Sequence, residues 1–240
     1  MACVSISARQ DQASRKEELM SKKLGVTIVV IVATCAVPAH VQAASDADVT
    51  CSPGVLCAES TVITEHNVGN IRFHVGSTTV GECTVGDLRG TLTAVSSSGF
   101  EGNIETTALS GTGTGGECTG SFGDFTFIGN VGNGTPWCMR ALATMNADEI
   151  QIRGNSCSLS SRSITFILNS TTAKECKYNR VPAVVGSYST NDSDAKISFT
   201  NAAFSLESGG ILCPSTVEVD MSMTLEKATT PQTTDPLNIS

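Results

Sequence analysis

Cysteine is the residue type in this 240-residue chain whose chemistry is most informative, because ten cysteines are present. Eight of them follow the export signal described below, and an even number in an exported chain indicates a disulfide framework. No two of the eight have the C-x-x-C spacing of a metal site, so disulfides are favoured over metal. Successive antiparallel strands usually lie side by side, which predicts pairing between sequence neighbours: Cys51–Cys57, Cys83–Cys118, Cys138–Cys157 and Cys176–Cys213.

Two histidines, His66 and His74, follow the export signal and could each serve as a general base. A hydrolase triad also needs a nucleophile, and no G-x-S-x-G or comparable motif accompanies either histidine. His74 alternates with Arg72 on the polar face of an expected strand, which favours a solvated surface histidine. Two strand histidines without a third ligand also make a poor metal site. The sequence therefore predicts no catalytic, cofactor-binding or metal-binding residue, and no cofactor.

Other polar residues have competing interpretations. The tetrapeptide Asn191–Asp194 gathers oxygen ligands that could bind calcium, but it lacks the glycine and distal glutamate of an EF-hand loop, so a turn is favoured. Trp137 precedes a cysteine and is interpreted as a core residue covering a disulfide, with a sugar-stacking surface residue as the alternative. Scattered carboxylates could form a glycosidase pair only if their strands face each other, and their spacing is typical of surface charge: Glu82, Asp87, Glu117, Asp124, Asp148 and Glu149.

The N-terminal region has the features of a cleaved secretory signal. Lys22 and Lys23 precede an apolar run from 24 to 39, and Val41-Gln-Ala-Ala44 offers small residues for cleavage after Ala43. The run is shorter than the ~20 residues of a spanning helix. Residues 1–43 are thus the expected signal region, and residues 1–19 fit no part of a signal, so translation could begin at Met20. The alternative is lipid attachment at Cys35, after a sequence resembling a lipobox.

The net charge of the exported part limits the classes of partner that it can bind. After cleavage the chain keeps 10 Lys and Arg against 20 Asp and Glu, a net charge of −10. An acidic surface repels phosphate backbones and anionic lipid, so nucleic acid is not an expected partner. The partner is unknown, with a surface glycan or a protein as the expected kinds. No membrane span is expected after signal cleavage, because the candidate strands are too short and poor in aromatic residues.

Short stretches with alternating apolar and polar residues recur along the exported part, and no amphipathic helical pattern is present. Alternation with period two places one set of side chains on a core face. The expected fold is an all-β, disulfide-stapled antiparallel β-sandwich, with a small β-barrel as the alternative. The clearest strands are 71–75, 125–128, 150–152, 164–168, 196–199, 203–206 and 217–225.

One β-sandwich domain is expected over residues 44–227, followed by a disordered Thr- and Pro-rich tail at 228–240. The Gly-, Ser- and Thr-rich stretch 96–120 could be a linker or a long hairpin loop, and strands on both of its sides are expected to share a core. The strongest apolar positions are predicted to be buried: Phe125, Phe127, Trp137, Ile150, Ile152, Ile164, Phe166, Leu168, Phe199, Phe204, Val219 and Leu225.

A series of short motifs spans residues 80–227: Gly116-Glu-Cys-Thr-Gly120, Pro136-Trp-Cys138, Cys157 followed by Arg162-Ser-Ile-Thr-Phe166, Cys176-Lys-Tyr178, and Cys213-Pro214. The series resembles a group of small secreted bacterial proteins with paired cysteines and no established activity. The resemblance implies an extracytoplasmic β-protein and brings no catalytic residues.

These observations favour a secreted or cell-surface structural or binding protein without catalytic activity, whose ligand is unknown. They rest on the lack of a nucleophile–base motif and on strands rich in Ser, Thr and Gly. The alternative is an exported hydrolase that acts on polysaccharide through the scattered carboxylates.

Overall fold

The computed structural model describes residues 49–52, 55–129, 136–142, 144–146, 148–154, 157, 163–181, 183–189, 195–230 and 233–239. These residues belong to one compact unit that spans Gln42–Ser240. The described elements are nearly all strands, in agreement with the predicted all-β class. They are β1 (Val49–Ser52), β2 (Val55–Leu56), β3 (Val62–Asn67), β4 (Ile71–Val75), β5 (Thr78–Cys83), β6 (Val85–Ser96), β7 (Gly99–Ser110), η1 (Thr114–Gly116), β8 (Thr119–Gly120), β9 (Phe125–Ile128), β10 (Trp137–Leu142), β11 (Glu149–Arg153), β12 (Ile164–Ser170), β13 (Lys174–Arg180), β14 (Val184–Ser189), β15 (Ala195–Ser208), β16 (Thr216–Thr230), β17 (Thr233–Pro236) and β18 (Asn238–Ile239).

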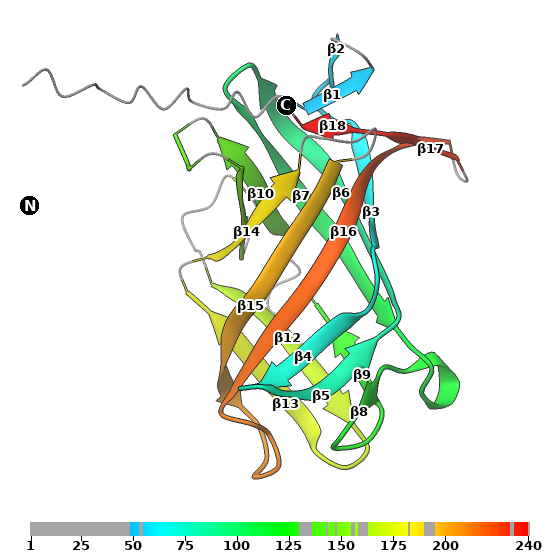
Figure 1. The fold of residues 1–240 in the computed structure, drawn as a ribbon, viewed down its shortest axis with the longest axis vertical. Coiled ribbons are helices and arrows are strands. Elements are labelled where there is room, and N and C mark those ends of the chain that lie inside the picture. Colours follow the sequence, from blue (N-terminus) through cyan, green and yellow to red (C-terminus); the bar gives the residue numbers. More distant parts are fainter. Residues whose placement is uncertain are drawn as a thin grey trace, which may run out of the picture. The chain divides into compact units, whose positions relative to one another are not determined.

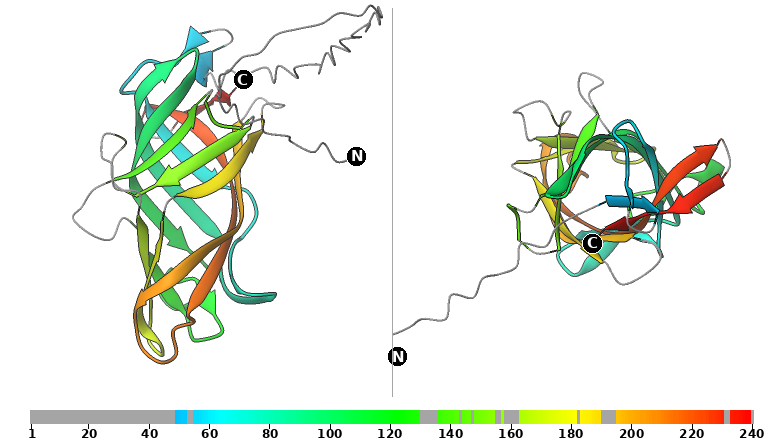
Figure 2. Two further views of the ribbon diagram at one scale, coloured as in Figure 1. Left: turned by 90° about the vertical axis from the view of Figure 1, so that its left-hand side faces the viewer. Right: turned by 90° about the horizontal axis from the view of Figure 1, so that it is seen from above.

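Eight of the described strands close into an antiparallel barrel, which we call the upper barrel. Its order is β16-β3-β6-β7-β10-β11-β14-β15, and pairing of β15 with β16 completes the ring (Figure 1; Figure 2, right). The register across the closing pair includes Ala195 opposite Leu225 and Ile197 opposite Met223. The favoured β-sandwich is therefore wrong and the alternative barrel is right, because no two-sheet arrangement accommodates a ring that pairs all the way round.

Two long strands extend beyond the upper barrel and pair there with further strands. Strands β15 and β16 have 14 and 15 residues, and their far halves pair with β13 and β4 respectively. The sheet then continues through β12 and β9 on one side and through β5 and β8 on the other. A bridge between Cys118 and Phe125 connects the two sides. The turns of these strands form the lower end of the molecule, at the bottom of Figure 1.

The barrel wall is apolar inside and polar outside, as period-two alternation requires. On β6, for example, Leu88 and Leu92 are buried whereas Asp87 and Arg89 are exposed. Of the twelve residues predicted to be buried, ten are, and Phe127 and Leu168 are half-buried but still pack against the core. The predicted assignment of these side chains to the inner face of their strands is therefore confirmed.

The upper end of the barrel is covered by a small sheet of β1, β2 and β18 (Figure 2, right). Val49 of β1, Ile239 of β18 and the preceding Leu237 are fully buried, and the backbone amide of Ala195 donates a 2.7 Å hydrogen bond to the Leu237 carbonyl. Within the tail for which disorder was expected, residues 233–239 form β17, β18 and the position between them. Burial of Leu237 and Ile239 stabilises this segment despite its polar composition.

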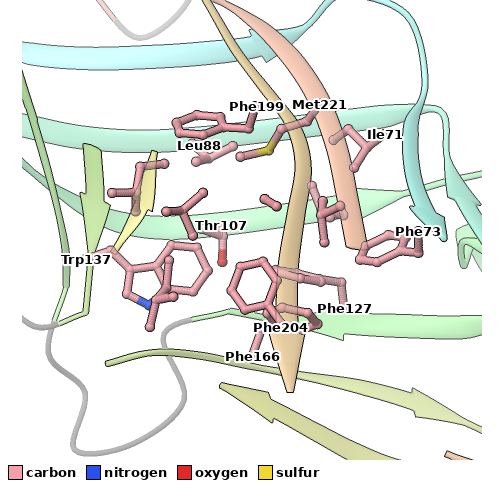
Figure 3. A pocket seen from close by; sticks show the side chains of 16 residues that line it. Ile71, Phe73, Leu88, Thr107, Phe127, Trp137, Phe166, Phe199, Phe204 and Met221 are labelled. Carbon is pink, nitrogen blue, oxygen red and sulfur yellow. The ribbon is translucent and has the colours of Figure 1, made fainter. Parts of the chain in front are cut away.

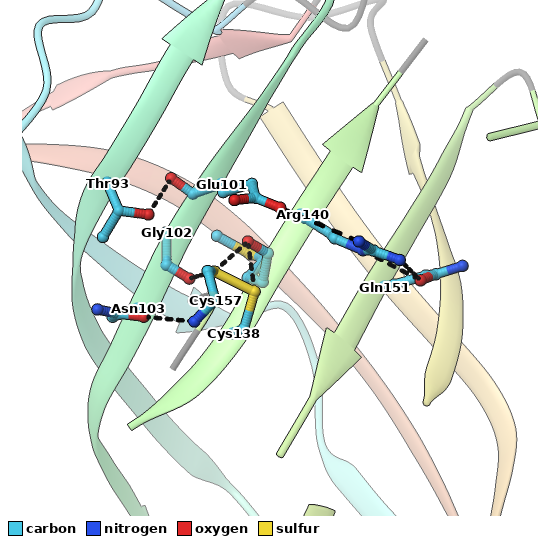
Figure 4. The surroundings of a disulfide bond; sticks show 9 residues. Thr93, Glu101, Gly102, Asn103, Cys138, Arg140, Gln151 and Cys157 are labelled. Atoms are coloured by element: carbon cyan, nitrogen blue, oxygen red, sulfur yellow. Dashed lines mark hydrogen bonds and ion pairs between the residues drawn. A yellow bond between two sulfur atoms is a disulfide. The ribbon is translucent and has the colours of Figure 1, made fainter. Parts of the chain in front are cut away.

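All four predicted disulfides are present, with Cα–Cα separations between 4.6 and 5.6 Å. Bridges of this kind typically contribute about 2–4 kcal/mol each. Figure 4 shows that Cys138 and Cys157 join on the outside of the sheet, where the Cys157 amide also donates to the Asn103 side chain at 3.2 Å. Trp137 is a core residue, as predicted, but it faces the interior and does not cover this bridge, because adjacent strand residues point to opposite faces.

The glycine-rich stretch is not a linker. Twelve of its 25 residues form strand β7, which pairs with β6 on one side and β10 on the other, and the two residues after Ser96 form the tight turn that joins β6 to β7. Residues 111–118 form the loop between β7 and β8, with η1 inside it. Glycine is required at Gly90, where a Cβ atom would lie 2.1 Å from the Asn103 carbonyl oxygen. The small residues of this hairpin therefore allow two strands to approach closely at a bulge.

Candidate functional site

The interior of the barrel is filled with side chains and contains no chamber for a ligand among the described residues. The cavity in Figure 3 has a volume of about 50 Å³ and is lined by mostly apolar side chains, among them Phe73, Trp137, Phe166, Phe199 and Phe204. A second void, of about 40 Å³, is also lined by Phe73. A cavity of ~150 Å³ is needed to hold a molecule as small as benzene. The barrel therefore acts as a packed scaffold, like other small barrels whose interior is filled.

One ionisable side chain lies inside this apolar barrel. Glu65 on β3 is only 2% exposed, and it lies opposite Leu88 of β6 and Leu225 of β16, both of which are buried. No hydrogen bond or ion pair of the Glu65 carboxyl is found among the described residues. Desolvation by burial raises the pKa of Glu65 to about 7. The sequence analysis missed this residue, although its alternation with Ile63 on β3 was a usable signal.

Both histidines lie on the outer face of the sheet, as predicted for His74, but the His74 side chain is only 16% exposed and is therefore not the solvated residue that was expected. Nδ1 of His66 lies 2.5 Å from Oδ1 of Asp87, and both side chains are about half exposed. Nε2 of His74 lies 3.1 Å from Oδ2 of Asp220, and its Nδ1 lies 3.2 Å from Oγ1 of Thr79. Thr79 is directly opposite His74 in the sheet, so this is a cross-strand polar contact on a convex surface.

The scattered carboxylates lie at separate places, and those that form hydrogen bonds have different partners. Glu82 contacts Arg72 and Asn70, and Asp124 accepts a 2.8 Å hydrogen bond from the Thr114 amide. Glu149 accepts a 2.8 Å hydrogen bond from Gln151, while Asp148 is an exposed turn residue with φ of 60°. Glu117 contributes its carbonyl oxygen to the loop before β8. Within the described part of the chain, no contact joins two of these carboxyl groups to each other.

Possible metal ligands also stay apart among the described residues, where no group of three His, Cys, Asp or Glu residues is close enough to hold an ion. The tetrapeptide Asn191–Asp194, for which a turn and a calcium site were weighed, lies outside the described residues.

The most unusual surface is at the lower end, where three loops expose large apolar side chains. We call these loops the tip: residues 75–78, 121–124 and 209–215. Ile211 is 97% exposed, Leu212 46%, Val75 39% and Phe122 38%. Together they border an open groove of about 450 Å³ that Thr78, Val80, Cys213 and Pro214 also line. A cluster of exposed apolar residues of this kind is typical of an interaction surface.

The tip is held in place by the fold beneath it. Cys213 is bonded to Cys176 of β13, and its amide donates a 3.0 Å hydrogen bond to the Gly210 carbonyl, so the loop that presents Ile211 is anchored at its base. Phe122 lies in a tight loop closed by the 3.1 Å bond from the Gly123 amide to the Gly120 carbonyl, and Gly123 has φ of +94°. The tip therefore combines exposed apolar side chains with a fixed backbone.

The sequence analysis did not identify the tip. A usable signal was the apolar pair Ile211-Leu212 between Gly210 and Cys213, since loop residues are usually polar. Phe122 and Val75 gave no comparable signal, because their proximity to this loop depends on the order of strands in the sheet.

Comparison with known proteins gives no further guidance. No protein-family model matches the chain, and neither a curated protein nor a solved structure matches it. Among the residues that the structure describes, no helix is long and apolar enough to cross a membrane.

Proposed function

We propose that the chain is a secreted or cell-surface binding protein without catalytic activity, and that it binds its partner through the tip. The observation that carries the proposal is the exposure of Ile211, Leu212, Phe122 and Val75 on neighbouring, anchored loops. Loops positioned by a rigid scaffold are the usual location of binding residues. The interior formed by the described residues supports the same conclusion, because its two voids of about 50 and 40 Å³ are too small for a bound organic molecule.

Export is part of this proposal. Four intramolecular disulfides fit an oxidising compartment. The resemblance to small secreted bacterial proteins points to the same location, and the acidic charge fits a protein that does not bind nucleic acid. All described elements follow Ala43, after which we propose that signal peptidase cleaves.

N-terminal sequencing of the exported protein is expected to begin at Ala44, because the small residues Val41 and Ala43 follow the apolar run directly. A mature chain that begins at a lipidated Cys35 would contradict this prediction and would make the protein a membrane-anchored lipoprotein.

The binding role predicts that the mature protein attaches to extracellular material through the tip. The double variant Ile211→Ser/Leu212→Ser should reduce retention on intact cells of the producing organism and on its extracellular matrix by tenfold or more, because it removes two exposed apolar groups. The matched control is Val185→Ser, which changes a residue of β14 that is 49% exposed and outside the tip. Retention can be measured by quantitative immunoblotting of washed cells and matrix. Equal retention of the wild type and the double variant would refute binding through the tip.

A further inference from the structure

We infer that the tip docks onto an uncharged lipid surface, such as the interface of a zwitterionic bilayer. This inference rests on the proposed function, since it names the partner of the same surface. Four features of the tip support it: the protruding apolar side chains, a groove with few polar groups, the lack of basic residues, and a small contact area.

The groove of the tip suits hydrocarbon better than a polar small molecule. Ligand pockets usually contain a few placed polar groups that fix the orientation of the ligand. Here the walls are Val75, Val80, Phe122, Leu212 and Pro214, with the Thr78 side chain as a polar contribution. Ile211 extends from the rim of the groove at 97% exposure. A fluid acyl chain can fill such a groove, while Ile211 inserts among neighbouring chains.

The charge of the tip specifies which lipids fit. The three loops of the tip contain no lysine or arginine, and their one acidic residue, Asp124, has its carboxylate bonded to the Thr114 amide. The exported chain as a whole has a net charge of −10. A basic patch is the feature that attracts proteins to anionic lipid, and the tip has none. An anionic surface would therefore repel this protein, whereas a zwitterionic one would not.

The size of the tip argues against a second protein, including another copy of this chain, as the occupant. A stable protein–protein interface takes roughly 20–30 residues from each side. The tip presents only three short loops, and its exposed large apolar side chains are Val75, Phe122, Ile211 and Leu212. Shallow insertion into a bilayer interface needs no matching surface, so a few apolar side chains suffice for it.

Sedimentation with protein-free phosphatidylcholine vesicles tests the inference. The mature wild-type protein should bind these vesicles, and raising the salt concentration should leave binding unchanged. Ile211→Ser/Leu212→Ser should weaken binding tenfold or more, and Val185→Ser should not. Vesicles that contain phosphatidylserine should bind less protein, increasingly so at low salt. Circular dichroism should show that both variants keep the strand content of the wild type.

Several outcomes would overturn the inference. The wild-type protein could fail to bind phosphatidylcholine vesicles and still attach to cells or matrix through Ile211 and Leu212. This result would leave the proposed function intact and would exclude an uncharged lipid surface as the partner. Stronger binding to phosphatidylserine vesicles would contradict the charge argument. Sedimentation equilibrium that shows a dimer of the wild type and a monomer of the double variant would make a second copy the occupant of the tip.

Discussion

Replacing Phe166 by alanine should lower the free energy of unfolding by about 3–5 kcal/mol, the usual cost of removing a large aromatic side chain from a core. Phe166 is 2% exposed and lies at the centre of an aromatic cluster. Its ring centroid is 4.8 Å from that of Phe204, 5.2 Å from that of Phe127 and 5.5 Å from that of Tyr178. The barrel interior cannot collapse around the lost ring, because β12 is paired on both edges.

Urea unfolding with the disulfides intact measures this effect as a lower midpoint at an unchanged denaturant dependence. The control is Phe122→Ala, which removes a phenyl ring from the tip. Because Phe122 is 38% exposed, this substitution should lower the free energy of unfolding far less. A loss below about 1 kcal/mol for Phe166→Ala would mean that the cluster is not the centre of the core.

Glu65 should make the protein less stable as the pH rises from about 4.5 to about 7. Because burial raises the pKa of Glu65 from 4.5 to about 7, the folded state holds a proton that the unfolded state releases in this range. The stability that this proton provides is fully present below pH 4.5 and is lost as the pH passes 7. The difference between the two pKa values corresponds to about 3 kcal/mol.

The variant Glu65→Gln cannot ionise, so its stability relative to the wild type should rise by about 3 kcal/mol between pH 4 and pH 8. Glu59→Gln is the matched control, since it removes an exposed carboxylate before β3, and its stability should follow the wild type across the same range. Free energies of unfolding measured in urea at several pH values give both comparisons. A constant difference between Glu65→Gln and the wild type would show that Glu65 is solvated or partnered in the folded state.

Local patterns in the sequence predicted much of the fold. The expected strands at 71–75 and 125–128 coincide with β4 and β9, because strict alternation over a short run is typical of a half-buried strand. The disulfides were predictable as well, since each joins segments that are near neighbours along the chain. Most expected core residues are buried for the same reason, as alternation assigns them to the inner face.

Features that depend on distant pairings were not predictable. The ring also requires pairing of β3 with β16, which lie near opposite ends of the described sequence, and no residue pattern in either strand reveals its partner. The cover at the upper end arises in the same way, from pairing of β1 with β18. The tip likewise combines loops that are far apart in the sequence. A single alternating strand is compatible with a sandwich or a barrel, which is why the closure was not foreseen.

Hydrogen–deuterium exchange of the mature protein, free and bound to phosphatidylcholine vesicles, tests the central claim most directly, because it locates the binding surface without any substitution. We expect slower exchange in the loops 121–124 and 209–215 on binding, and unchanged exchange in β10 and β11 of the upper barrel. Bound protein in which the protection falls on the outer face of the upper barrel, with none in the tip loops, would contradict the account.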